Sequence, residues 1–182
     1  VDFKKIGLED YGKPGNYVAR QVSRWSKQYR ASETDNIEAM NNLIEWLPKN
    51  IPDDDETTIV HGDYRLDNMI LKNNEVIGIL DWELSTLGHP IADFSYHCLS
   101  WRTQEAFWDE AKLKELGIPS EKEYMEMYCE NTGKDLSKNW EFYMAFNMFK
   151  IAGILQGILG RVRDGTAASK HAEERGNMVF PL

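Results

Sequence analysis

Cysteine and histidine are scarce in this chain, which limits the metal and redox chemistry it could support. Its 182 residues include two cysteines and four histidines. Cys98 and Cys129 stand 31 positions apart, and no Cys-x-x-Cys or Cys/His metal spacing occurs. We therefore expect two reduced thiols rather than a zinc site or a disulfide framework.

Positive charge is also in short supply. The chain has 21 Lys and Arg against 30 Asp and Glu, which gives a net charge of −9 and a pI near 5.0. A nucleic-acid-binding domain calls for a basic surface, so we expect no such partner. There is no uninterrupted apolar run of about 18 residues, the length of a membrane span. The first residues lack the apolar region of a signal peptide. We expect a soluble, cytoplasmic protein without a membrane partner.

Apolar and aromatic residues, in contrast, are plentiful. They amount to 42% and 12% of the chain, with six tryptophans, which is enough to bury the core of one domain. Periodicity and turn residues predict a mostly helical α+β domain over 1–182. Its expected parts are an irregular segment at 1–15, helices within 16–56, a loop and β-hairpin at 57–81, and helices through 82–182.

The individual helices are expected where apolar residues recur at helical spacing. The expected ranges are 16–30, 36–47, one beginning at Pro90, 103–116, 120–131, 140–163 as the strongest, and a short one within 165–182. Gly153, Gly157 and Gly160 within the strongest helix indicate close packing against a neighbour, since each glycine costs up to ~1 kcal/mol relative to alanine.

One short segment carries most of the chemical information. It reads His-Gly-Asp-Tyr-Arg-Leu-Asp-Asn at 61–68, after a β-branched run, and Asp81 follows 13 residues after its last member. Phosphoryl transfer needs a carboxylate that orients an attacking hydroxyl and two oxygen ligands for Mg²⁺. We predict that Asp63 is the base. We predict that Asn68 and Asp81 bind Mg²⁺ and, through it, the nucleotide.

The neighbours of Asp63 suggest supporting roles. Arg65 carries a planar cation that could reach the migrating phosphoryl group and offset its developing charge. His61 is expected to pack and hydrogen-bond so that the loop is held, because a base already stands two residues away. Gly62 would let the backbone turn tightly. For Glu83 we favour packing or a surface ion pair over contact with the metal or the acceptor.

The convergence of Asn68 and Asp81 depends on a hairpin. Asn73 and Asn74 tolerate positive φ and predict a two-residue turn between two apolar runs. Paired residue numbers would then sum to 147, so that Asn68 faces Ile79 and Asp81 lies on the same face as Asn68, roughly 5–8 Å away. A slip of one residue would turn Asp81 to the opposite face.

These residues resemble those of a known family. The segment at 61–68, with Ile-Leu-Asp-Trp-Glu at 79–83, resembles the Brenner-type motif and the metal-binding Asp of the aminoglycoside phosphotransferase and choline kinase group. Segments 28–34, 43–48, 80–90 and 154–158 are similar to the phosphotransferase domain of acyl-CoA dehydrogenase family members 10 and 11 and its bacterial relatives. The resemblance covers roughly residues 16–165.

The resemblance implies a protein-kinase-like fold, ATP as donor, Mg²⁺, and a small-molecule hydroxyl as acceptor, with a hydroxyacyl-CoA as the acceptor of this branch. It also implies that Asp93 hydrogen-bonds the backbone of the catalytic loop. No G-x-G-x-x-G and no V-A-I-K-like strand precedes residue 57. We therefore expect a C-terminal lobe whose partner is a missing N-terminal lobe, with half of the ATP site here.

Other interpretations compete with the enzyme. A kinase-fold module without activity could bind a phosphorylated ligand or a partner protein. A metal-dependent phosphohydrolase is less favoured, because it would bring more His and Asp ligands. The acidic run at 53–56 is expected to be a solvated, self-repelling turn rather than a metal site. The stripe of Arg20, Arg24 and Lys27 is expected to be a solvated helix face, with contact to a ligand's phosphates as the alternative.

Overall fold

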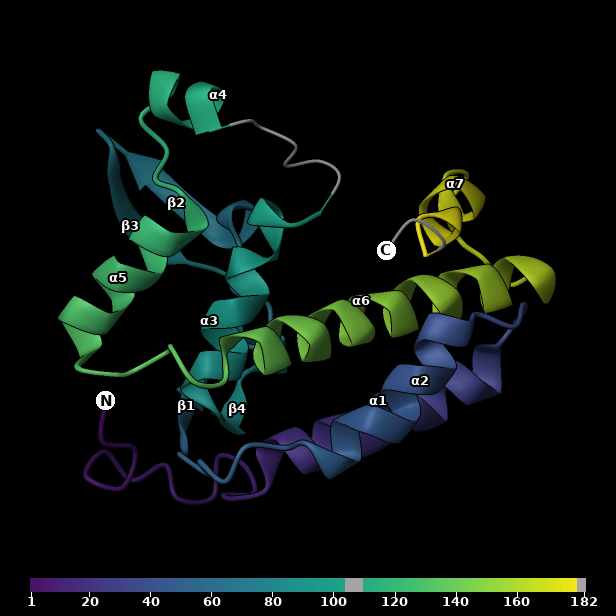
Figure 1. Ribbon diagram of the computed structural model, residues 1–182, viewed down its shortest axis with the longest axis horizontal. Coiled ribbons are helices and arrows are strands. Elements are labelled where there is room, and N and C mark those ends of the chain that lie inside the picture. The colour runs from purple at the N-terminus through teal and green to yellow at the C-terminus, as the bar shows by residue number, and fades with distance from the viewer. Residues whose placement is uncertain (104–109, 180–182) are drawn as a thin grey trace.

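The computed structural model describes residues 1–103 and 110–179. Its α-helices are α1 Tyr17–Ser32, α2 Glu38–Trp46, α3 Pro90–Cys98, α4 Glu110–Glu115, α5 Glu121–Thr132, α6 Trp140–Arg163 and α7 Ala172–Asn177 (Figure 1). Its strands are β1 Thr58–Val60, β2 Met69–Lys72, β3 Glu75–Ile79 and β4 Thr86–Gly88. Short 3₁₀ turns cover Leu47–Lys49, Leu66–Asn68, Trp82–Leu84 and Leu99–Trp101. The mostly helical α+β character predicted from the sequence is confirmed.

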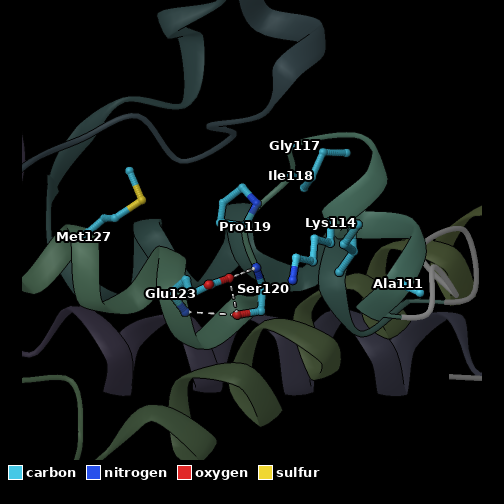
Figure 2. A pocket seen from close by; sticks show the side chains of 9 residues that line it. Ala111, Lys114, Gly117, Ile118, Pro119, Ser120, Glu123 and Met127 are labelled. Atoms are coloured by element: carbon cyan, nitrogen blue, oxygen red, sulfur yellow. Dashed lines mark hydrogen bonds between the residues drawn. The ribbon is translucent and has the colours of Figure 1, made fainter.

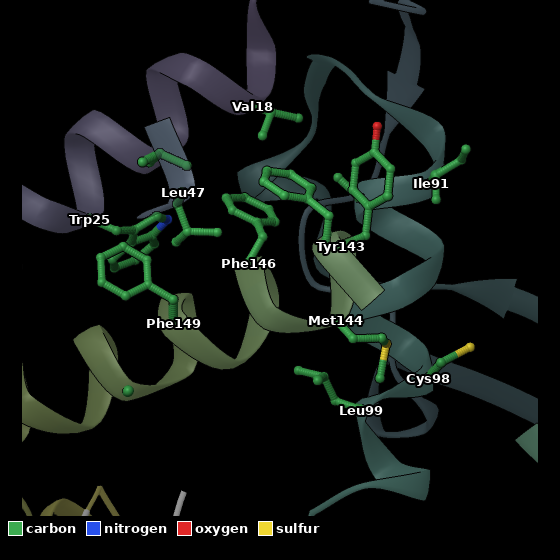
Figure 3. Close-up of a cluster of buried hydrophobic side chains, with 14 of the residues drawn as sticks. Val18, Trp25, Leu47, Ile91, Cys98, Leu99, Tyr143, Met144, Phe146 and Phe149 are labelled. Atoms are coloured by element: carbon green, nitrogen blue, oxygen red, sulfur yellow. The ribbon is translucent and has the colours of Figure 1, made fainter. Parts of the chain in front are cut away.

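Helix α6 runs through the middle of the molecule and packs against α1, α3 and α7 (Figure 1). Apolar side chains recur along it at helical spacing, so that it has a broad buried face. Tyr143, Phe146 and Phe149 are at most 2% exposed. Figure 3 shows them lying between Val18 and Trp25 of α1 and the neighbouring elements. The core therefore sits where α1, α3 and α6 meet.

The glycines of α6 face α1. A Cβ added at Gly160 would lie 3.0 Å from Cβ of Ser32, and one added at Gly153 would lie 3.5 Å from the Trp25 ring. The close approach of the two helices that these glycines predicted is confirmed. At Gly160 a larger residue would force the helices apart.

By length and composition alone α6 could cross a membrane, with a mean hydropathy of 1.3 over its most apolar window. The helix contains no uninterrupted apolar run of membrane-spanning length, because glycines and polar residues interrupt it. More than half of the window, 56%, is buried inside the structure. This is the behaviour of the core helix of a globular domain.

Most predicted helices are found within two residues of their expected ends. Helix α6 has the predicted bounds, and the irregular segment at 1–15 contains turns only. Of the helix predicted near 103–116, residues 104–109 lie outside the described residues and α4 forms its second half.

The prediction of helix through 82–182 is wrong at Thr86–Gly88. These residues form β4, which pairs antiparallel with β1 in the register Thr58 with Gly88 and Val60 with Thr86. A three-residue strand has too little pattern to be read locally. Its partner lies more than 25 positions earlier, so the pairing is a tertiary effect.

The hairpin of β2 and β3 has the predicted turn but only part of the predicted register. Asn73 and Asn74 both have positive φ, 52° and 63°. Leu71 pairs with Val76 as predicted, but Ile70 pairs with Gly78, because a β-bulge shifts the register between them. The predicted pairing is therefore wrong by one residue beyond the bulge.

The acidic run at 53–56 is exposed along its whole length, as predicted for a solvated turn, but three of its members also make specific contacts. Asp55 accepts a hydrogen bond from the Asn16 backbone N–H at the start of α1, at 2.8 Å. Glu56 forms an ion pair with Lys134. Asp54 lies 3.7 Å from His89.

Candidate active site

The segment at 61–68, called here the catalytic loop, is anchored by Asp93 of α3. The Asp93 carboxylate accepts hydrogen bonds from the backbone N–H groups of His61 at 2.7 Å and Gly62 at 2.8 Å. Two charge-assisted bonds of this length fix the start of the loop relative to the buried helices. The support role inferred for Asp93 is confirmed.

His61 holds the loop from the other side. Its ring is 3% exposed and its Nε2 lies 2.8 Å from the carbonyl oxygen of Leu80. That oxygen can only accept, so Nε2 carries the proton, and Nδ1 accepts from the Asp63 backbone N–H at 3.3 Å. Both nitrogens are occupied by the fold. The packing role predicted for His61 is confirmed.

Gly62 makes the tight turn that its sequence position suggested. Its φ is +84°, and an added Cβ would lie 2.8 Å from the carbonyl oxygen of Leu84. A side chain would therefore be both strained and obstructed. The Gly62 carbonyl accepts a hydrogen bond from Nζ of Lys150 at 3.0 Å. This ties the catalytic loop to α6.

The structure brings Asp63 and Asn68 together. Nδ2 of Asn68 donates to the backbone oxygen of Asp63 at 2.9 Å and to its carboxylate Oδ2 at 3.0 Å. These two bonds use both hydrogens of the amide nitrogen and orient the carboxylate. The amide oxygen of Asn68 has no hydrogen-bond donor among the described residues, so it can accept a cation.

Asp81 comes directly after Leu80, the residue that is hydrogen-bonded to the catalytic loop. Leu80 donates its backbone N–H to the Asn68 carbonyl at 2.8 Å, so Asn68 lies opposite Leu80 and not opposite Ile79 as predicted. Asp81 then has φ 62° and ψ 54°, which ends the strand. Side chains alternate between the two faces of a strand, which is why Asp81 and Asn68 were expected on one face, but this alternation does not hold at a residue with left-handed backbone angles. The left-handed backbone sets the direction of the Asp81 side chain.

The donor set fits Mg²⁺. Asp81 is exposed and makes no hydrogen bond or ion pair within the described part of the chain, so its carboxylate is available together with the Asn68 amide oxygen. The described residues contain no cluster of three or more His, Cys, Asp and Glu side chains. Mg²⁺ in phosphotransferases typically uses one or two protein oxygens and completes its shell with phosphate and water. Hard oxygen donors of this number suit it.

Arg65 has a different partner from the one predicted. It forms an ion pair with Asp67, two residues away, and hydrogen bonding to that carboxylate raises the pKa of Arg65. Both side chains are largely exposed, so the pair is weak and can open. Contact of Arg65 with a phosphoryl group stays a prediction.

A cavity of about 490 Å³ opens beside Asp63. Its wall includes Arg24 from α1, Tyr96 from α3, Lys150 from α6, and Glu83. The surface ion pair expected for Glu83 is not found among the described residues. Burial, followed by the charge and hydrogen bonding of Asp63, raises the pKa of Tyr96 to about 12. Tyr96 therefore stays protonated and can donate toward the Asp63 carboxylate.

Sequence reasoning missed Tyr96 and Lys150, since each stands within an apolar helical stretch where a polar residue looks incidental. For the cationic stripe on α1, the alternative of contact with a ligand agrees with the position of one of its residues. Arg20 donates to the backbone oxygens of Gly15 and Lys13, a structural role, whereas Arg24 faces the cavity.

A hollow of about 810 Å³ lies away from these residues, between α4 and α5 (Figure 2). It is lined by Lys114, Ile118, Pro119 and Met127 around the Ser120–Glu123 capping box that starts α5. None of the predicted site residues lines it, and its Ser120 and Glu123 side chains bond to each other. The cavity beside Asp63 is the better candidate for the acceptor.

Comparison with known proteins agrees with this geometry. Residues 1–128 match the model of the phosphotransferase enzyme family. The whole chain superposes with a TM-score of 0.93 on the crystal structure of a protein of Ralstonia eutropha JMP134 described as a "putative aminoglycoside phosphotransferase". The two are 52% identical, and the chain covers 57% of that protein. The chain belongs to the phosphotransferase enzyme family.

Two curated relatives are much longer than the chain. Mouse acyl-CoA dehydrogenase family member 10 is 46% identical over 186 residues, which are 98% of this chain and 17% of that protein. Human acyl-CoA dehydrogenase family member 11 is 41% identical over 189 residues, covering 100% of this chain and 24% of that protein. The chain thus spans about a sixth to a quarter of the length of these relatives.

Proposed function

We propose that the chain is the catalytic lobe of an ATP- and Mg²⁺-dependent phosphotransferase that moves the γ-phosphoryl group to a hydroxyl of a small molecule. The observation that carries the proposal is the Asp63–Asn68 contact at 3.0 Å on an anchored loop, beside a cavity of the size of a small acceptor. Family membership supports an ATP donor.

The residues of the chain divide the work as follows. The Asp63 carboxylate would accept a hydrogen bond from the acceptor hydroxyl and take its proton late in the transfer. Asn68 holds that carboxylate in place, and Tyr96 lines the same cavity. Asn68 and Asp81 would hold Mg²⁺, which when bound offsets the charge of the phosphates. Arg65 would leave Asp67 and approach the transferred group.

The same lobe would meet the rest of the ATP site at the β2–β3 hairpin. Leu71 and Ile77 there are 61% and 57% exposed. Because the similar Ralstonia protein is considerably longer than this chain, we propose that an N-terminal lobe packs near this face and supplies the nucleotide-covering loop and the strand lysine.

For the acceptor we propose a hydroxyacyl-CoA. The support is the similarity to proteins named as acyl-CoA dehydrogenase family members, together with a cavity that has both apolar walls and cationic groups. Fold alone does not choose an acceptor. A panel of hydroxyacyl-CoA, choline, sugars and an aminoglycoside would rank them by kcat/KM.

The role of Asp63 is tested in the intact protein. Asp63→Asn should lower kcat at least ~10²-fold because the base is lost, while Mg-ATP affinity survives. Asp81→Asn should instead weaken Mg-ATP binding. ADP release and calorimetric titration with Mg-ATP separate the two effects.

The matched control is Asp10→Asn, which removes an exposed carboxylate of the irregular N-terminal segment and should leave both quantities unchanged. Undiminished turnover in Asp63→Asn would remove the base assignment. A protein that binds phosphorylated ligands but turns over no acceptor would favour the non-catalytic module instead.

A further inference from the structure

Two cations face the cavity beside Asp63. Arg24 enters from α1 and Lys150 from α6, and both line its wall. Neither takes part in any of the ion pairs found among the described residues. Two like charges that share a cavity repel each other unless an anion lies between or beside them.

Lys150 is held in a fixed position. Its Nζ donates to the Gly62 carbonyl at 3.0 Å and lies 4.2 Å from the centre of the Tyr96 ring. An ammonium has three donors, and Gly62 takes one of them. The stem is half-buried in α6, so the ammonium cannot swing away to solvent as a surface lysine would.

The charges around Lys150 come from several elements. Burial lowers the pKa of Lys150 and the charge of Arg24 lowers it further, whereas Asp93 and Asp63 oppose that shift. The carboxylate of Asp93 already receives two backbone hydrogen bonds, and that of Asp63 receives one from Asn68. Both nearby carboxylates therefore already accept hydrogen bonds from the protein. A ligand anion would meet Arg24 and Lys150, neither of which has an ion-pair partner among the described residues.

Arg24 is more exposed than Lys150. Its guanidinium carbon lies 5.5 Å from the centre of the Trp25 ring on the same helix. The cavity contains one carboxylate besides the base, that of Glu83. Because Asp63 would be occupied by the acceptor hydroxyl, a polycationic acceptor would have Glu83 alone as a partner for its ammonium groups, whereas an anionic one would have both Arg24 and Lys150.

We propose that Lys150, assisted by Arg24, anchors an anionic oxygen of the acceptor and so selects hydroxylated anions over polycationic acceptors such as aminoglycosides. This inference rests on the proposed phosphotransferase function and adds the residues that determine its specificity. The anionic group binds at the α1–α6 side of the cavity while the hydroxyl of the same molecule reaches Asp63. In a free hydroxy acid this group is the carboxylate, whereas in a hydroxyacyl-CoA, whose carboxyl is a neutral thioester, it is a phosphate.

The test uses matched acceptors on the intact protein. Short hydroxycarboxylates of increasing length are compared with the corresponding neutral hydroxyamides and with phosphorylated diols. Lys150→Met should raise KM for the anionic acceptors about 10- to 100-fold, because a charge-assisted hydrogen bond is lost, and should change KM for the amides little. Lys150→Arg should recover much of the loss. Arg24→Gln should give a smaller change of the same kind.

The matched control is Lys122→Met, which removes an exposed lysine of α5 that does not line this cavity. The ratio of carboxylate to phosphate acceptors in kcat/KM identifies the preferred anion. If Lys150→Met lowers kcat equally for anionic and neutral acceptors, Lys150 only holds the Gly62 carbonyl and the proposal is overturned. Preference of the wild type for an aminoglycoside would overturn it as well.

A binding measurement separates this inference from the proposed function. Thermal shift with the hydroxycarboxylates, without nucleotide, should show stabilisation that Lys150→Met abolishes and Lys150→Arg retains. Such binding without phosphoryl transfer to any acceptor would overturn the proposed function and support the anion site. Transfer to hydroxyls with anion binding that does not depend on Lys150 would do the reverse.

Discussion

The helical frame of α1, α3 and α6 and the β2–β3 hairpin are both rich in apolar residues, yet they treat them differently. In the frame, Tyr143 and Phe149 are fully buried. In the hairpin, Leu71 is 61% and Ile77 57% exposed. Apolar side chains are therefore buried only where a second layer of structure covers them. The two-stranded hairpin has no such layer on its outer face within the described residues, and a two-stranded ribbon alone is only marginally stable.

The two regions also serve the site differently. The frame supplies fixed supports, namely Asp93 and Lys150, which bind the backbone of the catalytic loop. The hairpin carries the proposed metal ligands at its edges, Asn68 before β2 and Asp81 after β3. Burial is concentrated in the first region and the proposed Mg²⁺ ligands lie in the second, so substitutions should separate stability from activity.

The largest loss of stability is expected in the frame. Phe146→Ala should lower the free energy of unfolding by about 3–5 kcal/mol, because it opens a cavity in the fully packed core. Urea denaturation with linear extrapolation measures this. A loss below about 1 kcal/mol would mean that α6 repacks and that the frame is less rigid than its burial indicates.

A smaller loss is expected where the frame joins the loop. Asp93→Asn places an amide opposite one of the two backbone N–H groups that Asp93 now accepts, leaving that donor without a partner. We expect about 1–3 kcal/mol of destabilisation and a reduced kcat. Denaturation and turnover of the same sample report both, and Asp93→Glu is the charge-preserving comparison.

Acid should weaken the frame through His89. Burial lowers the pKa of His89 despite the opposing charges of Asp54 and Glu56, so the folded state keeps this ring neutral where the unfolded chain is protonated. Stability is then full above the ordinary pKa near 6.5 and falls as pH decreases toward the lowered pKa. Denaturation midpoints between pH 8 and 5 should show a gentler decline in His89→Gln. An unchanged decline would assign it to other groups.

The smallest effect is expected on the hairpin. Leu71→Ser removes a largely exposed side chain, so the free energy of unfolding of this chain should change by no more than about 0.5 kcal/mol. The same substitution in the intact protein should cost more if a second lobe covers the face. Equal and small effects in both proteins would argue against that lobe.

The frame was largely predictable from the sequence, because helix α6 shows its periodicity over 24 residues and Gly160 signals the close approach of α1. Strand β4 and the bulge between Ile70 and Leu71 were not predictable. Both depend on which partner a short strand finds, and that information is not local.

The candidate site divides in the same way. The grouping of Asp63 with Asn68 follows from their spacing in one loop, and the structure bears it out. Tyr96 and Lys150 come from helices distant in sequence and were missed, since only the folded arrangement brings them to Asp63. The Asp67 partner of Arg65 was also unforeseen, because a flexible side chain chooses among several nearby charges.

Leu80 has a further consequence. Its backbone N–H donates to the Asn68 carbonyl and its own carbonyl accepts a hydrogen bond from His61. One residue after β3 is thus hydrogen-bonded to both ends of the catalytic loop. The hairpin is therefore joined by hydrogen bonds to the loop that carries Asp63. We expect that a protein surface packed on the outer face of the hairpin would also change the position of Asp63.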